Sequence, residues 1–411
     1  MRYFSLARLS ELGYNYLSPF FIFYTKFIYN MSFKSALTNP ENLFVISLLV
    51  LLIFGSQGIK VEYIFPMVLL NAIVLLIYAI SVRGKLIIPK HFGIYVIFIL
   101  LLIFNTIFYR GEWRHGELFV SGGLFWLVFY NLPESILKKF STMIIVFGGV
   151  MSLIFLYNKL VGVLVDNSFL SLSSPPSEMI KHSHIGDLWT VILVMCFYGV
   201  TKKSTLWHSI LFIIGIYFLA VSMSRSAYVA LIVGISYVSY RLGFEKKFRG
   251  IFVGLLATMA VIFVFVSTQK STLFSRPYFI EALYRVSNHP LGLGMGYFIE
   301  ISSGFEKLFS GFGSVSLYAH NIVLEVVLGM GIFSAAFLWW LFRVLCSLFK
   351  DKKMDILYSA VFISVLTNFF FDITYMILSF VLIWFMGLGL AQRNQQPLKE
   401  LDFSKLFKRQ L

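Results

Sequence analysis

Long apolar runs separated by short polar connections make up most of this 411-residue chain. A helix needs roughly 20 mostly apolar residues to cross the hydrocarbon core of a bilayer. About twelve such runs can be recognised by their hydropathy. They lie near residues 42–57, 62–82, 92–109, 117–132, 141–160, 186–201, 205–222, 225–241, 250–268, 321–348, 355–371 and 373–391. The pattern predicts an all-α polytopic membrane protein in which residues 1–411 form a single integral membrane domain.

Composition excludes a soluble enzyme with one membrane anchor. Hydrophobic residues make up 59% of the chain and charged residues only 13%, with a mean hydropathy of +0.84. Soluble domains carry roughly a quarter of their residues as charged side chains. The net charge of +15 would suggest nucleic-acid binding in a soluble protein. Here the Lys and Arg residues lie mostly in short loops, where they set membrane topology, so we expect membrane lipids and no nucleic acid as partners.

The basic residues are concentrated in alternate loops. One set of loops, together with the C-terminal tail, holds Arg83, Lys85, Lys90, Lys138, Lys139, Lys202, Lys203, Arg241, Lys246, Lys247, Arg249, Lys350, Lys352, Lys353, Arg393, Lys399, Lys405, Lys408 and Arg409. The positive-inside rule therefore predicts that both termini are cytoplasmic. Two longer segments, 161–186 and 268–319, are then outside the cell membrane. In a bacterium this is an inner-membrane protein whose long loops and active site face the periplasm.

Ionisable residues gather at the predicted outer ends of the helices. Charges at apolar depth are costly unless they are paired or face a wet cavity, so such residues are functional candidates. They are Arg225, His320, Asn321, Glu325 and Asp372. Each also has a structural interpretation. Arg225 can snorkel to lipid phosphates, and His320 and Asn321 can cap a helix. Glu325 can pair with an Arg or orient His320, and for Asp372 we favour a cap of the last helix.

The predicted outer loops carry further candidates. Arg276 and Arg285 precede a Pro-rich and Gly-rich turn, HPLGLGMGYF at 289–298, whose alternate glycines let the backbone approach a ligand or another segment closely. The residues from Arg276 to Val286 have helical spacing. His182 and His184 stand two apart, which alone is weak support for a metal site because further ligands would have to converge. We expect neither a metal nor a cofactor.

Three segments in this order resemble the superfamily of O-antigen ligases and O-antigen polymerases, which are bacterial transferases of lipid-linked glycans. They are SRSAYVAL at 224–231, an Arg placed before HPLGLGMGYF, and AHNIVLEVVLGMGIFS at 319–334. The family's ligases tend to show His, then a polar residue, then Gly-x-x-Gly further on. His320, Asn321 and Gly331 fit this pattern, whereas the last Gly is Ser334. The resemblance covers roughly residues 180–335, and its HSHIGD stretch is most similar to the ligases.

The resemblance implies an all-helical, GT-C-like membrane glycosyltransferase with a structured periplasmic loop. A ligase would move an undecaprenyl-diphosphate-linked glycan onto a sugar hydroxyl of the lipid A-core, without a metal. Arginine suits the diphosphate because its planar fork holds two phosphate oxygens, and histidine suits the removal of the hydroxyl proton. The implied roles are His320 as catalytic base, Arg225 and Arg276 on the diphosphate, and support from Arg285, His182, His184, Asn321 and Glu325.

Two other functions stay open at this point. A polymerase would use the same donor with a lipid-linked repeat unit as the acceptor. A secondary transporter is a more remote alternative, because transporters usually place ionisable residues near the bilayer midplane and show repeated halves or broken spans. The unusual charges of this chain lie at the predicted outer face instead.

Overall fold

The computed structural model describes residues 40–56, 61–109, 111–166, 182–202, 206–222, 224–243, 284–298 and 321–403. The chain divides by its internal packing into two compact units, Met1–Leu48 and Leu49–Leu411. Only residues 40–48 of the first unit are described, and they belong to helix α3. Residues 49–411 form the second unit, which holds the other described residues. That residues 1–411 form a single domain stays a prediction.

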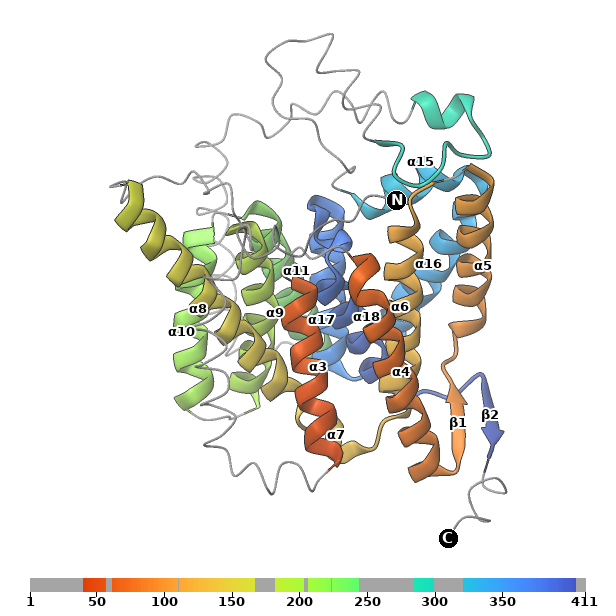
Figure 1. The fold of residues 1–411 in the computed structure, drawn as a ribbon. Coiled ribbons are helices and arrows are strands. Elements are labelled where there is room, and N and C mark those ends of the chain that lie inside the picture. The colour runs from red at the N-terminus through yellow and green to blue at the C-terminus, as the bar shows by residue number, and fades with distance from the viewer. Residues whose placement is uncertain are drawn as a thin grey trace, which may run out of the picture. The chain divides into compact units, whose positions relative to one another are not determined.

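Helices dominate the described residues (Figure 1). The α-helices are α3 (Pro40–Ser56), α4 (Val61–Arg83), α5 (Phe92–Tyr109), α6 (Trp113–Asn131), α7 (Glu134–Leu137), α8 (Phe140–Asp166), α9 (His182–Thr201), α10 (Leu206–Ser222), α11 (Arg225–Leu242), α15 (Ile322–Met330), α16 (Ala335–Lys350), α17 (Ile356–Phe371) and α18 (Leu378–Gln392). Two short 3-10 helices are η2 (Gly331–Ser334) and η3 (Ile373–Met376), and two strands are β1 (Lys85–Ile88) and β2 (Lys399–Asp402).

The helices confirm a multi-pass membrane protein. Of the predicted apolar runs, the one at 250–268 lies outside the described residues, and each of the others contains a helix. Five helical segments of the described chain are long and apolar enough to cross a bilayer. They are Ile64–Arg83, Phe92–Tyr109, Glu134–Tyr157, His184–Thr201 and Ile322–Lys350.

The apolar run at 321–348 is not the continuous helix that its composition predicts. Helix α15 ends at Met330, η2 follows, and α16 begins at Ala335. The α-helix breaks here because Gly331 has a φ of 52°, outside the right-handed helical region. The amide of Ile332 also donates to the carbonyl of Pro290 at 2.7 Å instead of to a carbonyl of the helix. A docked segment therefore interrupts the helix at this point.

Helix α18 forms the centre of the second unit. All its residues are buried, as expected for a helix that is apolar on every side. Its Trp384 and Phe385 contact the ring of Trp340 from α16 at centroid distances of 5.7 and 5.8 Å. Tyr95 from α5 also contacts Trp340, at 4.9 Å. Aromatic rings from three helices thus fill the core, and such pairs add stability beyond their buried area.

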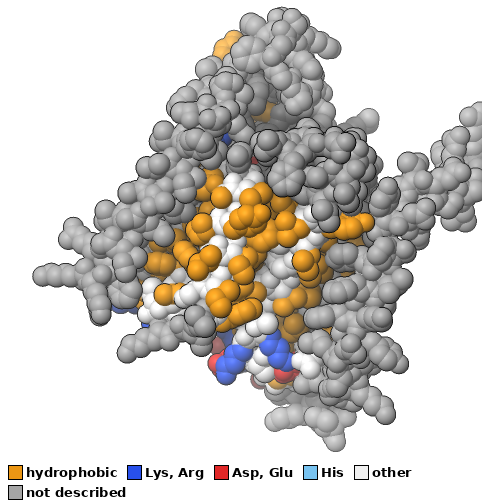
Figure 2. Space-filling view, turned by 90° about the vertical axis from the view of Figure 1, so that its left-hand side faces the viewer, with side chains coloured by type: hydrophobic (Ala, Val, Ile, Leu, Met, Phe, Trp, Pro, Cys, Tyr) orange, Lys and Arg blue, Asp and Glu red, His pale blue; other side chains and the backbone are white. Residues whose placement is uncertain are grey.

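The outer surface of several helices is strongly apolar. A space-filling view shows hydrophobic side chains across the described surface, with Lys and Arg gathered at its lower edge (Figure 2). Exposed aliphatic and aromatic side chains include Leu70 of α4, Leu100 and Phe108 of α5, and Ile213 of α10. A surface of this kind suits contact with lipid, where the backbone groups are satisfied inside each helix.

Several of the connections rich in Lys and Arg meet at one end of the second unit. Strands β1 and β2 pair there as an antiparallel ladder in which Lys85 is opposite Asp402 (Figure 1). Arg241 at the end of α11 donates to the carbonyls of Asp351 and Met354 at 3.1 and 3.2 Å. Gln395 donates to the Asp351 carboxylate at 2.7 Å. We call this the β1–β2 end; the small sheet is absent from the all-helical prediction.

Candidate functional site

The segment 290–294 docks onto the C-terminal end of α15. The amide of Leu293 donates to the carbonyl of Leu328 at 3.0 Å, and the amide of Gly294 donates to the carbonyl of Gly329 at 2.9 Å. The Gly-rich turn and the helix that begins the 321–348 run are therefore in direct backbone contact. This contact lies at the end of the helices opposite the β1–β2 end (Figure 1).

Glycine is required where these two segments touch. Gly292 has a φ of 89°, and a Cβ atom at this position would lie 2.3 Å from the carbonyl oxygen of Gly329. A Cβ atom on Gly331 would lie 2.2 Å from the carbonyl oxygen of Pro290. The glycines thus allow two backbones to approach each other, as their alternate spacing predicts. The partner is the protein's own helix, and no ligand is needed to explain them.

Asn321 is the N-cap of α15, which confirms the capping interpretation. Its Oδ1 accepts a hydrogen bond from the amide of Leu324 at 2.9 Å, the geometry expected of a cap. Its Nδ2 donates to the carbonyl of Phe370 at 3.1 Å. Asn321 therefore both starts α15 and ties it to the C-terminal turn of α17.

Glu325 lies one turn further along α15 and is 1% exposed. Its Oε1 is 3.5 Å from Nε2 of His115, and its Oε2 accepts a hydrogen bond from the hydroxyl of Tyr375 at 3.3 Å. His115 belongs to α6 and is also 1% exposed. Its Nδ1 faces Oε2 of Glu112 at 3.9 Å. His115 is not among the residues predicted from the sequence, although it stands in RGEWRHGELF, an ionisable stretch that opens an apolar run.

Arg225 begins α11 beside a second buried polar cluster. Ser224 is the N-cap of α11, and the hydroxyls of Ser224 and Ser226 donate to Oδ1 of Asp187 at 3.3 and 3.1 Å. Asp187 is on α9 and is fully buried. Asn368 of α17, with its amide nitrogen assigned toward this cluster, donates to the same Oδ1 at 3.2 Å. Arg225 itself is half-buried and directly follows Ser224 in the chain.

Helix α17 connects the two clusters. Its Asn368 contacts Asp187, and two residues later the carbonyl of Phe370 accepts from Asn321. The predicted site residues Arg225, Asn321 and Glu325 are thus held on α11 and α15, whose ends are linked through one turn of α17.

The prediction that Asp372 caps the last helix is wrong. Asp372 is the C-cap residue of α17, and its amide donates to the carbonyl of Asn368 at 2.8 Å. Helix η3 follows directly, and the last helix α18 begins only at Leu378 with Ile377 as its N-cap. A 3-10 turn that the sequence pattern does not reveal separates Asp372 from the helix it was expected to cap.

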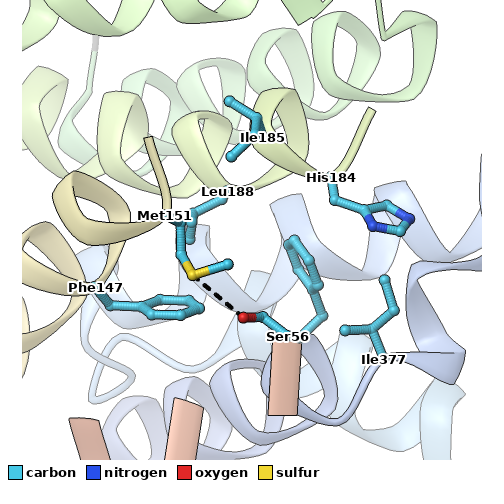
Figure 3. A pocket seen from close by; sticks show the side chains of 8 residues that line it. Ser56, Phe147, Met151, His184, Ile185, Leu188 and Ile377 are labelled. Atoms are coloured by element: carbon cyan, nitrogen blue, oxygen red, sulfur yellow. Dashed lines mark hydrogen bonds between the residues drawn. The ribbon is translucent and has the colours of Figure 1, made fainter. Parts of the chain in front are cut away.

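Two other supporting candidates lie apart from these clusters. Arg285 donates to the hydroxyl of Tyr297 at 3.3 Å, which holds the helical residues 284–288 against the Gly-rich turn. His184 lines a pocket of about 10 Å³, room for roughly one water molecule, together with Ser56, Met151 and Ile377 (Figure 3). The lining is mostly apolar, so this pocket does not suit a sugar or a phosphate.

Of the three remaining predicted site residues, only His182 is among the described residues. His182 is the first residue of α9, and His320 and Arg276 lie outside the described residues. Within the described ranges, no three His, Cys, Asp or Glu residues are arranged to hold a metal ion.

Known proteins add no family assignment. No protein-family model matches the chain, and no curated protein sequence matches it.

Proposed function

We propose that the chain is a membrane glycosyltransferase that moves an undecaprenyl-diphosphate-linked O-antigen glycan onto a sugar hydroxyl of the lipid A-core. The docking of segment 290–294 onto α15 carries this proposal, because it joins two of the three segments that resemble the family at one place. Helix α17 links this part of the fold to Asp187 and to the start of α11, where Arg225 lies, because its Asn368 contacts Asp187 and the carbonyl of its Phe370 accepts from Asn321.

The proposed chemistry needs stabilisation of a leaving diphosphate and removal of a hydroxyl proton. Arg225 at the start of α11 and Arg276 in the outer loop bind the diphosphate and offset the charge that develops as the glycosyl–phosphate bond breaks. His320 accepts the proton of the attacking hydroxyl. It directly precedes Asn321, whose two hydrogen bonds fix the start of α15. A fixed backbone at this position suits a positioned general base.

The reaction is proposed to occur without a metal at the periplasmic face of the inner membrane. In this arrangement the β1–β2 end, where basic loops meet, is cytoplasmic, in agreement with the positive-inside rule. The opposite end then faces the periplasm. About twelve spans in a GT-C-like arrangement remain part of this proposal, on the basis of hydropathy.

The acceptor separates the ligase from the polymerase alternative. Both transfer the same donor, and the HSHIGD stretch at the start of α9 favours the ligase. A strain without a ligase accumulates full-length lipid-linked polymer and a bare core. A strain without a polymerase instead carries a core with one repeat unit.

The test uses three single variants, Arg225→Ala, Arg276→Ala and His320→Ala, in a strain that lacks the chromosomal copy. Loss of general-base help lowers a rate by about 10²- to 10⁴-fold, so we expect His320→Ala to abolish surface glycan on gels. Lys352→Ala, an exposed residue of the β1–β2 end, is the matched control and should behave as wild type. Normal membrane levels with wild-type glycan in all three variants would overturn the proposed site.

A further inference from the structure

His115 is buried between two carboxylates, one in the interior of the protein and one at its surface. Glu325, on its Nε2 side, is 1% exposed, whereas the side chain of Glu112, on its Nδ1 side, is 51% exposed. The three side chains therefore form a row that leads from the interior near the start of α15 to the surface. Imidazole can gain a proton at one nitrogen and release another from the second nitrogen, which suits it to such a position.

The row is built where the two docked segments meet α6. The amide of Glu112 donates to the carbonyl of Met295 at 3.2 Å. A Cβ atom on Gly296 would lie 2.9 Å from the Glu112 side chain, so the Gly-rich turn packs directly on this carboxylate. The turn, α6 and α15 thus each contribute to the surroundings of His115.

Polar groups of the neighbouring elements lie around these three side chains. Tyr375 of η3 donates to Glu325, and Arg114 of α6 donates to the carbonyl of Met376 at 3.0 Å. Glu117, the next ionisable residue of α6 after His115, is half-buried. Burying an imidazole against a carboxylate is costly, and well-packed apolar side chains often hold helices together equally well. Packing alone therefore does not account for these residues.

We propose that Glu325, His115 and Glu112 form a proton relay that carries the proton of the transfer reaction from the site to the periplasmic surface; this rests on the proposed function. The acceptor O–H bond breaks as the new glycosidic bond forms, and the diphosphate leaves with the electron pair of the broken bond. Glu325 receives the proton that the acceptor hydroxyl gives up. His115 takes it at Nε2 and gives its Nδ1 proton to Glu112, which releases it to water.

The distances require a small movement of the side chains. Separations of 3.5 and 3.9 Å are longer than direct hydrogen bonds. A shift of the side chains toward one another when substrate binds would complete the row. His115 carries the proton onward from Glu325 in this scheme and does not itself touch the substrate.

The test compares the pH dependence of kcat for His115→Gln with that of the wild-type protein, purified as the full chain. Glutamine keeps the size and polarity of the side chain but does not carry a proton. We expect kcat to fall by about 10-fold and its pH profile to change shape, because glutamine cannot pass on a proton. Glu112→Gln should change kcat in the same direction.

His91→Gln is the matched control, because His91 is 3% exposed and lies just before α5 at the β1–β2 end. Its pH profile of kcat should follow the wild type. A His115→Gln variant with the wild-type profile and rate would overturn the relay while leaving the glycosyl transfer intact. Equal changes in the pH profile of kcat for His115→Gln and His91→Gln would also overturn the relay, because replacing any buried histidine would then have the same effect. Absence of transfer by the wild-type protein would instead contradict the proposed function.

Discussion

The amide of Gly294 donates to the carbonyl of Gly329 at 2.9 Å, which ties a Gly-rich turn inside the predicted loop 268–319 to the helix that follows this loop. This backbone contact leaves no room for side chains between the two segments. It brings the turn, α15 and the start of α6 together, and with them Glu325 and His115.

Gly292→Ala should weaken the docking of the turn on α15. The new methyl group would meet the Gly329 carbonyl, and φ would remain at 89°. Each of these effects is expected to cost about 1 to 3 kcal/mol of stability. The apparent melting temperature in detergent should therefore fall. Gly149→Ala is the control, because a Cβ atom there has no neighbour within 4 Å. Equal melting temperatures for the two variants would count against the docked turn.

Asp187→Ala should destabilise the contact between α9, α11 and α17. It leaves the hydroxyls of Ser224 and Ser226 without their shared acceptor. Unsatisfied buried groups typically cost about 1 to 3 kcal/mol, so the melting temperature should drop clearly. Ser379→Ala removes a buried hydroxyl that has no hydrogen-bond partner among the described residues. That variant should melt close to wild type, and a drop as large as that of Asp187→Ala would argue against the network.

His91 should make stability depend on pH. Burial, with smaller contributions from Lys90 and Arg343, lowers the pKa of His91 from 6.5 to about 4. The folded protein then resists a protonation that the unfolded chain accepts. Stability is fully present above pH 6.5 and is lost as the pH falls toward about 4. Melting temperatures across this window should decline less steeply for His91→Gln than for wild type. Parallel declines would show that another group is responsible.

The proposed orientation predicts opposite labelling of two engineered cysteines. Ser287→Cys is at the proposed periplasmic end and Lys352→Cys is at the β1–β2 end, and both positions are exposed. A membrane-impermeant maleimide should label Ser287→Cys in intact spheroplasts and Lys352→Cys only after lysis. The background protein would carry Cys196→Ser and Cys346→Ser, because both native cysteines are free thiols. The reverse labelling pattern would contradict the orientation.

Hydropathy predicts the helices of this protein well because each apolar run is a local feature. The breaks at Gly331 and Asp372 are less predictable, since they depend on segments that dock there from elsewhere in the chain. The pairing of β1 with β2 is equally hard to predict from the sequence, because each strand has only four residues and no alternating pattern. Cap residues such as Asn321 can be recognised locally. The partnership of His115 with Glu325 joins two helices and leaves no spacing in the sequence that would reveal it.

A reconstituted transfer assay tests the central proposal most directly. Purified protein would be supplied with undecaprenyl-diphosphate-linked glycan and either lipid A-core or a lipid-linked repeat unit as the acceptor. We expect glycan on the lipid A-core, no extended polymer on the repeat unit, and loss of product in His320→Ala. Product on the repeat unit alone would make the protein a polymerase. No transfer to either acceptor by the folded wild-type protein would contradict the proposed function.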